Sequence, residues 1–143
     1  MLINHDDIPQ VSQDFMNNTH SEEVDIINTL FEEILLYEKG ESSVEKVDAL
    51  YQTWVKHTIE HFTTEEVEMI EAEFPAFNMH KQAHDQALEH MDEVFAAWTK
   101  NREIKILKGY FIEAVPQWLM AHISSMDAMT ASFLGGGMMM HRS

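Results

Sequence analysis

The chain of 143 residues has the length of one domain and can bury a core without disulfide or metal staples. Its formal charge of −16, from 25 acidic and 9 basic residues, would repel a polyanionic partner and argues against binding to nucleic acid. It contains no cysteine, which excludes disulfides, thiolate metal sites, iron–sulfur clusters and covalently attached haem, so any bound metal would be held by nitrogen and oxygen atoms.

The first residues, MLINHDDIPQ, are acidic and lack the basic and apolar regions of a signal peptide. No run of about 18 apolar residues occurs in the sequence, so we expect a cytoplasmic protein with no membrane-spanning helix. Residues 1 to about 17 contain Pro9 and polar residues that are poor in a helix interior, which predicts an extended arm. Thr19 is then the expected N-cap of the first helix.

Apolar residues recur at helical spacing in the rest of the chain, which predicts an all-α protein with helices over about residues 20–39, 43–73, 77–99 and 103–131. Gly40 is the expected end of the first helix, and Ser42 or Ser43 is the expected cap of the second. The Phe74-Pro75 step then ends the second helix. The connections between these helices are short, which predicts an antiparallel up-down-up-down four-helix bundle.

Pro116 lies inside the fourth predicted helix and removes one backbone donor, so we expect a kink or a two-part helix there. The final residues, GGGMMMHRS, lack periodicity and begin with three glycines. This predicts a disordered tail over residues 135–143, after a single domain over residues 1–134. The helices show no second apolar stripe, so we expect a monomer.

Seven residues with metal-binding side chains fall at one end of the predicted bundle: His20, His61, Glu65, His80, His84, His122 and Asp127. In antiparallel order, the starts of the first and third helices lie beside the ends of the second and fourth, where these residues occur. Two pairs, in HFTTE and HKQAH, are four residues apart and therefore share a helix face. Asp127 follows His122 by five residues, so it must reach round or the helix must loosen near its end.

Five imidazoles and two carboxylates are too many ligands for one metal ion but suit two ions bridged by both carboxylates. Burying two carboxylates without cations would be prohibitive, so a metal also explains how they could lie inside. Any single histidine of this set could be an unrelated surface or core residue. That alternative does not explain why all seven residues fall at the same end of four helices. A non-covalent haem bundle would leave six of the seven positions unexplained.

The motifs HFTTEE in the second helix, HKQAHD in the third and WLMAHISSMD in the fourth make the chain resemble the single-domain bacterial hemerythrins over about residues 8–131. The resemblance implies a non-haem di-iron centre that binds dioxygen reversibly, for storage, delivery or sensing, in a protein that is not an enzyme. It implies that one iron is bound by His80, His84 and His122. The other would be bound by His20 and His61, which leaves it one open position for dioxygen.

The resemblance also implies that Glu65 and Asp127, with a solvent-derived oxo or hydroxo group, bridge the two iron ions. Trp118 and Leu119 match a pair that lines the oxygen pocket in the family, although ordinary core packing would explain both equally well. His57, at a position where the family often has Tyr, is either an outer group near the metal or, as we favour, a partly buried and hydrogen-bonded histidine. Manganese or zinc can occupy nitrogen and oxygen sites that iron uses, so these residues do not fix the metal.

Glu23 departs from the family, which often has an apolar residue three positions after the first ligand histidine. An offset of three residues places it on the same helix face as His20, towards the open iron position. There it could coordinate iron, hydrogen-bond a bound water or peroxide, or supply a proton, any of which would favour a di-iron redox enzyme of the peroxidase or oxidase type. Alternatively, it is a solvated acidic residue that the helix dipole stabilises in a first turn.

Overall fold

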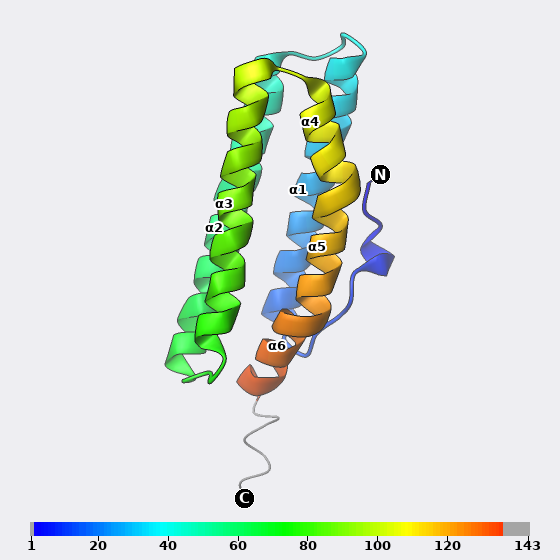
Figure 1. Cartoon of the computed structure of the whole chain (residues 1–143). Coiled ribbons are helices and arrows are strands. Elements are labelled where there is room, and N and C mark those ends of the chain that lie inside the picture. The colour runs from blue at the N-terminus through cyan, green and yellow to red at the C-terminus, as the bar shows by residue number, and fades with distance from the viewer. Residues whose placement is uncertain (1, 136–143) are drawn as a thin grey trace, which may run out of the picture.

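The computed structural model describes residues 2–135, which contain helices and connecting segments but no strand. These residues fold into four helical rods. The first three rods are the single helices α1 (Asp14–Glu38), α2 (Val44–Glu71) and α3 (Phe77–Asn101). The fourth is an unbroken series of α4 (Ile104–Gly109), η2 (Tyr110–Ala114), α5 (Val115–His122), η3 (Ile123–Asp127) and α6 (Ala128–Leu134). Figure 1 shows the rods packed together, each running in the direction opposite to the one before it. The predicted all-α, four-helix fold class is confirmed.

The first helix begins earlier than predicted, because α1 starts at Asp14 and not near residue 20. The Asn17 side chain accepts from the Val11 N–H at 2.9 Å and donates to its carbonyl at 2.8 Å, which ties the preceding segment to the first turn. Thr19 therefore lies inside the helix and does not cap it. Its hydroxyl donates instead to the Phe15 carbonyl at 2.8 Å.

The segment before α1 is held against the bundle by a buried asparagine. Asn28 accepts from the Ile3 N–H and donates to the Ile3 carbonyl, both at 2.8 Å, and so satisfies both backbone groups. Ile3 and Ile8 are buried with the apolar core. The short 3-10 helix η1 (His5–Asp7) lies between them in the chain. These residues are therefore part of the folded structure.

The other helix ends follow their sequence signals. Ser43 caps α2 by accepting from the Lys46 N–H at 3.2 Å. Gly40 follows α1 with φ at 77°, a left-handed conformation that glycine adopts without a steric penalty. The second helix ends shortly before Phe74-Pro75, as predicted.

The fourth rod, over residues 104–134, contains two π-turns, in which a backbone N–H bonds to the carbonyl five residues earlier. In η2 the Val115 N–H bonds to the Tyr110 carbonyl, next to Pro116, which has no N–H to donate. The irregularity predicted at Pro116 is thus a widened turn within a continuous rod. In η3 the Ala128 N–H bonds to the Ile123 carbonyl.

Aromatic side chains form the centre of the apolar core. The rings of Tyr51, Trp54 and Phe111 contact one another. The ring centroids are 5.0 Å apart for Trp54 and Phe111, 5.3 Å for Tyr51 and Trp54, and 6.2 Å for Tyr51 and Phe111. The Tyr51 hydroxyl donates to the Met91 carbonyl at 2.8 Å, so its polar group is satisfied inside the core. Each fully buried large apolar side chain contributes about 1.5–3 kcal/mol, which makes this core a main source of stability.

None of the described helices combines the length and hydropathy that crossing a membrane requires. Of the tail predicted over residues 135–143, only Gly135 belongs to the described part of the chain. The rest of that prediction lies outside the described residues.

Candidate metal centre

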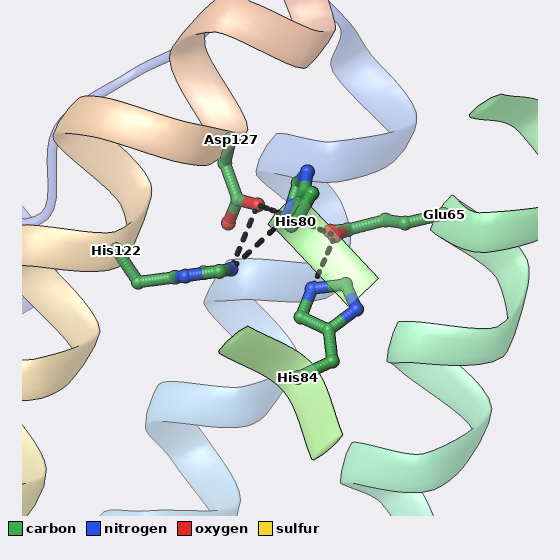
Figure 2. A group of neighbouring side chains, drawn as sticks. All are labelled: Glu65, His80, His84, His122 and Asp127. Carbon is green, nitrogen blue, oxygen red and sulfur yellow. Dashed lines mark hydrogen bonds and ion pairs between the residues drawn. The ribbon is translucent and has the colours of Figure 1, made fainter. Parts of the chain in front are cut away.

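The seven predicted ligands lie together at one end of the bundle. They come from all four rods: His20 from α1, His61 and Glu65 from α2, His80 and His84 from α3, and His122 and Asp127 from α5 and η3. All are buried, with at most 6% of their surface exposed. Figure 2 shows five of them, with side chains from three rods pointing toward one another. The structure therefore brings together every residue that the sequence predicted as a metal ligand.

The first group of potential ligand atoms comes from Glu65, His80, His84, His122 and Asp127, and these atoms lie within 4.8 Å of one another. Nε2 of His84 is 3.4 Å from Oε1 of Glu65. Nε2 of His80 and Nε2 of His122 are 3.0 and 3.2 Å from Oδ1 of Asp127. Three imidazole nitrogens and one oxygen of each carboxylate thus face a common point.

The second group comes from His20, His61, Glu65 and Asp127. Nε2 of His20 is 2.9 Å from Oδ2 of Asp127, and Nε2 of His61 is 2.7 Å from Oε2 of Glu65. These are the carboxylate oxygens that the first group does not use. Each carboxylate therefore presents one oxygen to each group of histidines, which is the arrangement of a bridge between two metal ions.

The π-turn η3 explains how Asp127 reaches the other ligands. On a regular α-helix, a residue five positions after His122 would lie about 140° round the helix axis. The wider turn of η3 (Ile123–Asp127) reduces this offset, and both side chains face the same group of ligand atoms. Of the two possibilities predicted from the sequence, the loosened helix is confirmed.

Outer hydrogen bonds orient two of the imidazoles. Nδ1–H of His80 donates to the Thr130 hydroxyl at 2.7 Å, and Nδ1–H of His84 donates to Oε2 of Glu66 at 2.9 Å. These bonds select the tautomer in which Nε2 carries no proton and is free to bind a metal. Neither partner was predicted from the sequence. Thr130 follows Asp127 by three residues, a helical spacing that could have revealed it, whereas Glu66 has no comparable signal.

The residues present fit two metal ions, because the cluster contains buried polar atoms without partners. Among residues 2–135, the buried side-chain nitrogen and oxygen atoms that lack a hydrogen bond are Nδ1 of His20 and His61, Oε1 of Glu65, Nε2 of His84 and Oδ1 of Asp127. All belong to the seven predicted ligands. Leaving such an atom unsatisfied costs about 1–3 kcal/mol, and more for a charged group. Metal ions at the two groups would satisfy the atoms that face inward, and a nitrogen and oxygen donor set suits iron.

The electrostatic environment favours the metal-binding forms of Glu65, Asp127 and His122. Burial raises the pKa of the Glu65 carboxyl, but the hydrogen bond from His61 and the nearby His84 imidazole outweigh it and lower that pKa. The pKa of Asp127 is also lowered, because bonds from histidines outweigh its burial. Burial lowers the pKa of His122. Ionised carboxylates and a neutral imidazole are the states that bind metal.

Glu23 is buried, with 4% of its surface exposed, so the interpretation as a solvated residue is wrong. Its Oε2 accepts from Trp54 Nε1 at 2.7 Å and from the Thr58 hydroxyl at 2.8 Å, and its Oε1 accepts from Nδ1–H of His57 at 2.7 Å. Burial raises the pKa of Glu23, but the hydrogen bond from His57 and the nearby His61 imidazole outweigh it and lower the pKa to about 2. Within the described residues, neither group of ligand atoms includes this carboxylate.

Glu23 lies behind the ring of one predicted ligand, His61. Nδ1 of His61 lies 3.7 Å from Oε1 of Glu23, on the side of the ring opposite to the atom that faces Glu65. Burial lowers the pKa of His61, but the two carboxylates more than offset it and raise the pKa to about 10. A metal at Nε2 would displace a proton there and leave Nδ1–H directed at Glu23.

His57 is a partly buried, hydrogen-bonded histidine, as we favoured from the sequence. Its side chain is 19% exposed and lies between Glu23 and Glu22, with Nε2 3.6 Å from the Glu22 carboxylate. The hydrogen bond to Glu23 raises the pKa of His57, against the opposing effect of burial. His57 lies one helical turn before His61 on α2, and its partly exposed ring reaches the buried Glu23 carboxylate.

A cavity of about 410 Å³ adjoins the cluster and contains Trp118 and Leu119 in its wall. Leu119 is 4% exposed, whereas Trp118 is 38% exposed. The Trp118 ring stacks on His122, with centroids 4.5 Å apart and an interplanar angle of 11°. Both residues thus lie where the resemblance predicted a pocket, and Trp118 also packs directly on a ligand ring.

A four-helix bundle with buried histidines and carboxylates from every rod at one end defines a helical cation-binding protein. The chain belongs to the hemerythrin family: the Hemerythrin HHE cation binding domain matches residues 11–134. It is 33% identical over 135 residues to a bacteriohemerythrin of Aquifex aeolicus (strain VF5), which covers 94% of this chain and 99% of that protein. No solved structure matches the chain significantly. The resemblance predicted from the motifs is confirmed.

Proposed function

We propose that the chain is a non-haem di-iron protein that binds dioxygen reversibly, for storage, delivery or sensing. The observation that supports this most directly is the pair of carboxylates, Glu65 and Asp127, each with one oxygen facing each group of histidines. One iron would be held by His80, His84 and His122, and the other by His20 and His61. Glu65 and Asp127 would hold both ions, and the bound ions would supply the electrons and the open coordination position for dioxygen.

The asymmetry between the two histidine groups favours oxygen binding at one ion only. Three imidazoles face the first group of ligand atoms, whereas His20 and His61 alone face the second. The second ion would therefore have one imidazole ligand fewer than the first. The cavity borders both groups, because its wall contains His61 of the second group, His122 of the first and the shared Asp127.

The surrounding side chains would keep water and protons away from the ions. Leu119 and Phe62 supply apolar walls, and Trp118 lies between His122 and solvent. We propose that Glu23 positions His61 by accepting from its Nδ1–H. Its two oxygens already accept three other bonds, which favours a carrier over a redox enzyme in which Glu23 occupies the open position.

The test is an oxygenation cycle followed by visible spectroscopy. The iron-loaded protein is reduced without air, exposed to oxygen and then purged, and we expect an oxygenated spectrum that reverts on purging. Rapid, irreversible oxidation would contradict the carrier and support the redox enzyme.

Glu23→Leu then shows whether Glu23 is responsible for either outcome, and Glu32→Leu, at an exposed position of the same helix, is the matched control. We expect Glu23→Leu to retain both ions and to autoxidise at a changed rate, because His61 loses its outer partner. Glu32→Leu should behave as the unmodified protein. If Glu23 instead ligates iron, its loss should change the spectrum of the resting di-iron form.

A further inference from the structure

The cavity beside the cluster is much larger than dioxygen requires. Its volume is about 410 Å³, whereas a water molecule occupies about 30 Å³ in the liquid and an engineered apolar cavity of about 150 Å³ in another protein binds benzene. Binding sites for small organic molecules typically measure about 300–1,000 Å³. The space therefore has the size of a site for an organic molecule of two rings.

The wall of the cavity is largely aromatic and aliphatic. Trp54, Phe62, Tyr110 and Trp118 contribute rings, and Met91 and other aliphatic side chains contribute most of the remainder. Aromatic side chains attract planar rings through stacked or edge-to-face contacts, each worth about 0.5–1.5 kcal/mol beyond the area buried.

The helical geometry contributes to the space. Tyr110 and Ala114, the first and last residues of the π-turn η2, both line the cavity. A π-turn widens the helix at one point, and such turns occur frequently at functional sites. Ala87 of α3 and Ala114 have only a methyl group at the wall, so the cavity lies where the rods present small side chains.

The charges around the cavity favour a neutral occupant. The chain carries a formal charge of −16, which disfavours an anion. The carboxylate of Glu23 lines the cavity, but three donors already engage it, and a carboxylate offers about four acceptor positions. His61 is placed to take the fourth. An organic cation would therefore find no free counter-charge at Glu23, and Asp127, the other carboxylate in the wall, would be taken up by the bound metal ions.

We infer that this cavity is a binding site for a neutral two-ring aromatic molecule of about the size of indole. The molecule would enter past the exposed residues His90, Gln117 and Trp118 and would lie between the rods beside His61 and His122. This site is additional to the proposed binding of dioxygen, because it uses the protein wall and needs no open metal position.

Calorimetric titration of the metal-loaded protein with indole tests the inference. We expect saturable binding of one indole per chain, tighter than the binding of benzoate or of trimethylphenylammonium. In protein with 13C-labelled methionine methyl groups, indole should shift the signal of Met91, which lines the cavity, and leave that of Met16, which is buried elsewhere. Nonsaturable binding, or tighter binding of either charged compound, would overturn the inference.

Two substitutions that fill the cavity test the same inference at separate positions of its wall, so the result does not depend on a single variant. Ala87→Leu and Ala114→Leu should each weaken indole binding at least about tenfold, because each adds about three methylene-sized groups to the wall. Ala96→Leu, at an exposed position of α3, is the matched control and should bind indole as the unmodified chain does. Thermal unfolding of each variant shows whether it is folded. Folded variants that both bind indole unchanged would place the ligand elsewhere.

One consequence rests on the proposed function. Because the cavity connects exposed residues with the cluster, bound indole should slow the association of dioxygen, and Ala87→Leu should abolish the effect of indole. A protein that binds indole but shows no reversible oxygenation would contradict the proposed function alone. A protein that oxygenates reversibly but does not bind indole would contradict this inference alone.

Discussion

The two ends of the bundle are built from opposite kinds of side chain. Where α3 is followed by α4, the interior is apolar, and Val47, Tyr51, Trp98 and Leu107 are fully buried. At the other end the interior holds the five histidines and two carboxylates of the predicted ligand set. The first end can form by hydrophobic burial alone. The second leaves polar atoms unpartnered, so we expect bound cations to stabilise it.

The largest expected effect is at the polar end. Asp127→Ala removes one of the two carboxylates shared by both groups of ligand atoms, so we expect most of the bound metal to be lost, as measured by elemental analysis. Amide hydrogen exchange should accelerate around η3 and the end of α2, and much less around Trp98. Asp85→Ala, in an exposed ion pair with Lys81, should keep its metal. Uniform acceleration along the rods would show that the two ends are not separable.

The converse experiment destabilises the apolar end. Phe111 is fully buried, so Phe111→Ala should lower the free energy of unfolding by about 3–5 kcal/mol in denaturant titrations. Because Phe111 lies outside both groups of ligand atoms, the metal content should not change. Ile112→Ala, at a neighbouring position that is 50% exposed, should change stability by no more than about 0.5 kcal/mol. Loss of metal from folded Phe111→Ala protein would contradict the separation.

A smaller effect is expected from an outer hydrogen bond. Thr130→Val removes the acceptor for Nδ1–H of His80 and keeps the shape of the side chain. We expect metal affinity to fall about 10–100-fold in competition with a chelator, since outer partners of ligand histidines typically contribute this much. Thr130→Ser retains the hydroxyl and should bind nearly as tightly as the original chain. Equal affinities for the valine and serine variants would show that the bond does not orient His80.

The smallest expected effect concerns His57, at the border between the two ends. The Glu23 carboxylate raises the pKa of His57, so Glu23→Gln should lower it toward the ordinary value of 6.5 in an NMR titration. A raised histidine pKa contributes stability that is fully present below the ordinary value and is lost as pH rises through the raised value. The stability difference between the two proteins should therefore shrink with rising pH. The other charged groups near this ring are Glu22 and His61.

The sequence predicted the fold class and the residues of the candidate site, because both depend on helical periodicity. Apolar spacing defines which face of each helix is buried, and short connections bring residues such as His20 and His80 to one end. The five-residue spacing before Asp127 allowed either a side chain that reaches round or a loosened helix, and the structure shows the second.

What the sequence did not predict depends on contacts of a helix with other parts of the chain. The early start of α1 rests on the bonds of Asn17 to Val11, and the orientation of Glu23 rests on donors from α2. Helical spacing placed Glu23 on the ligand face of α1 but could not show which partners its carboxylate would meet. Glu66 illustrates the same limit, because its bond to His84 joins two helices.

The most direct test of the di-iron centre is the iron content of the protein after anaerobic loading with Fe(II) and removal of loosely bound metal. Two ligand groups share Glu65 and Asp127, so we expect two iron ions per chain. A value of one or less, with all seven ligand residues intact, would contradict the dinuclear centre and with it the proposed binding of dioxygen.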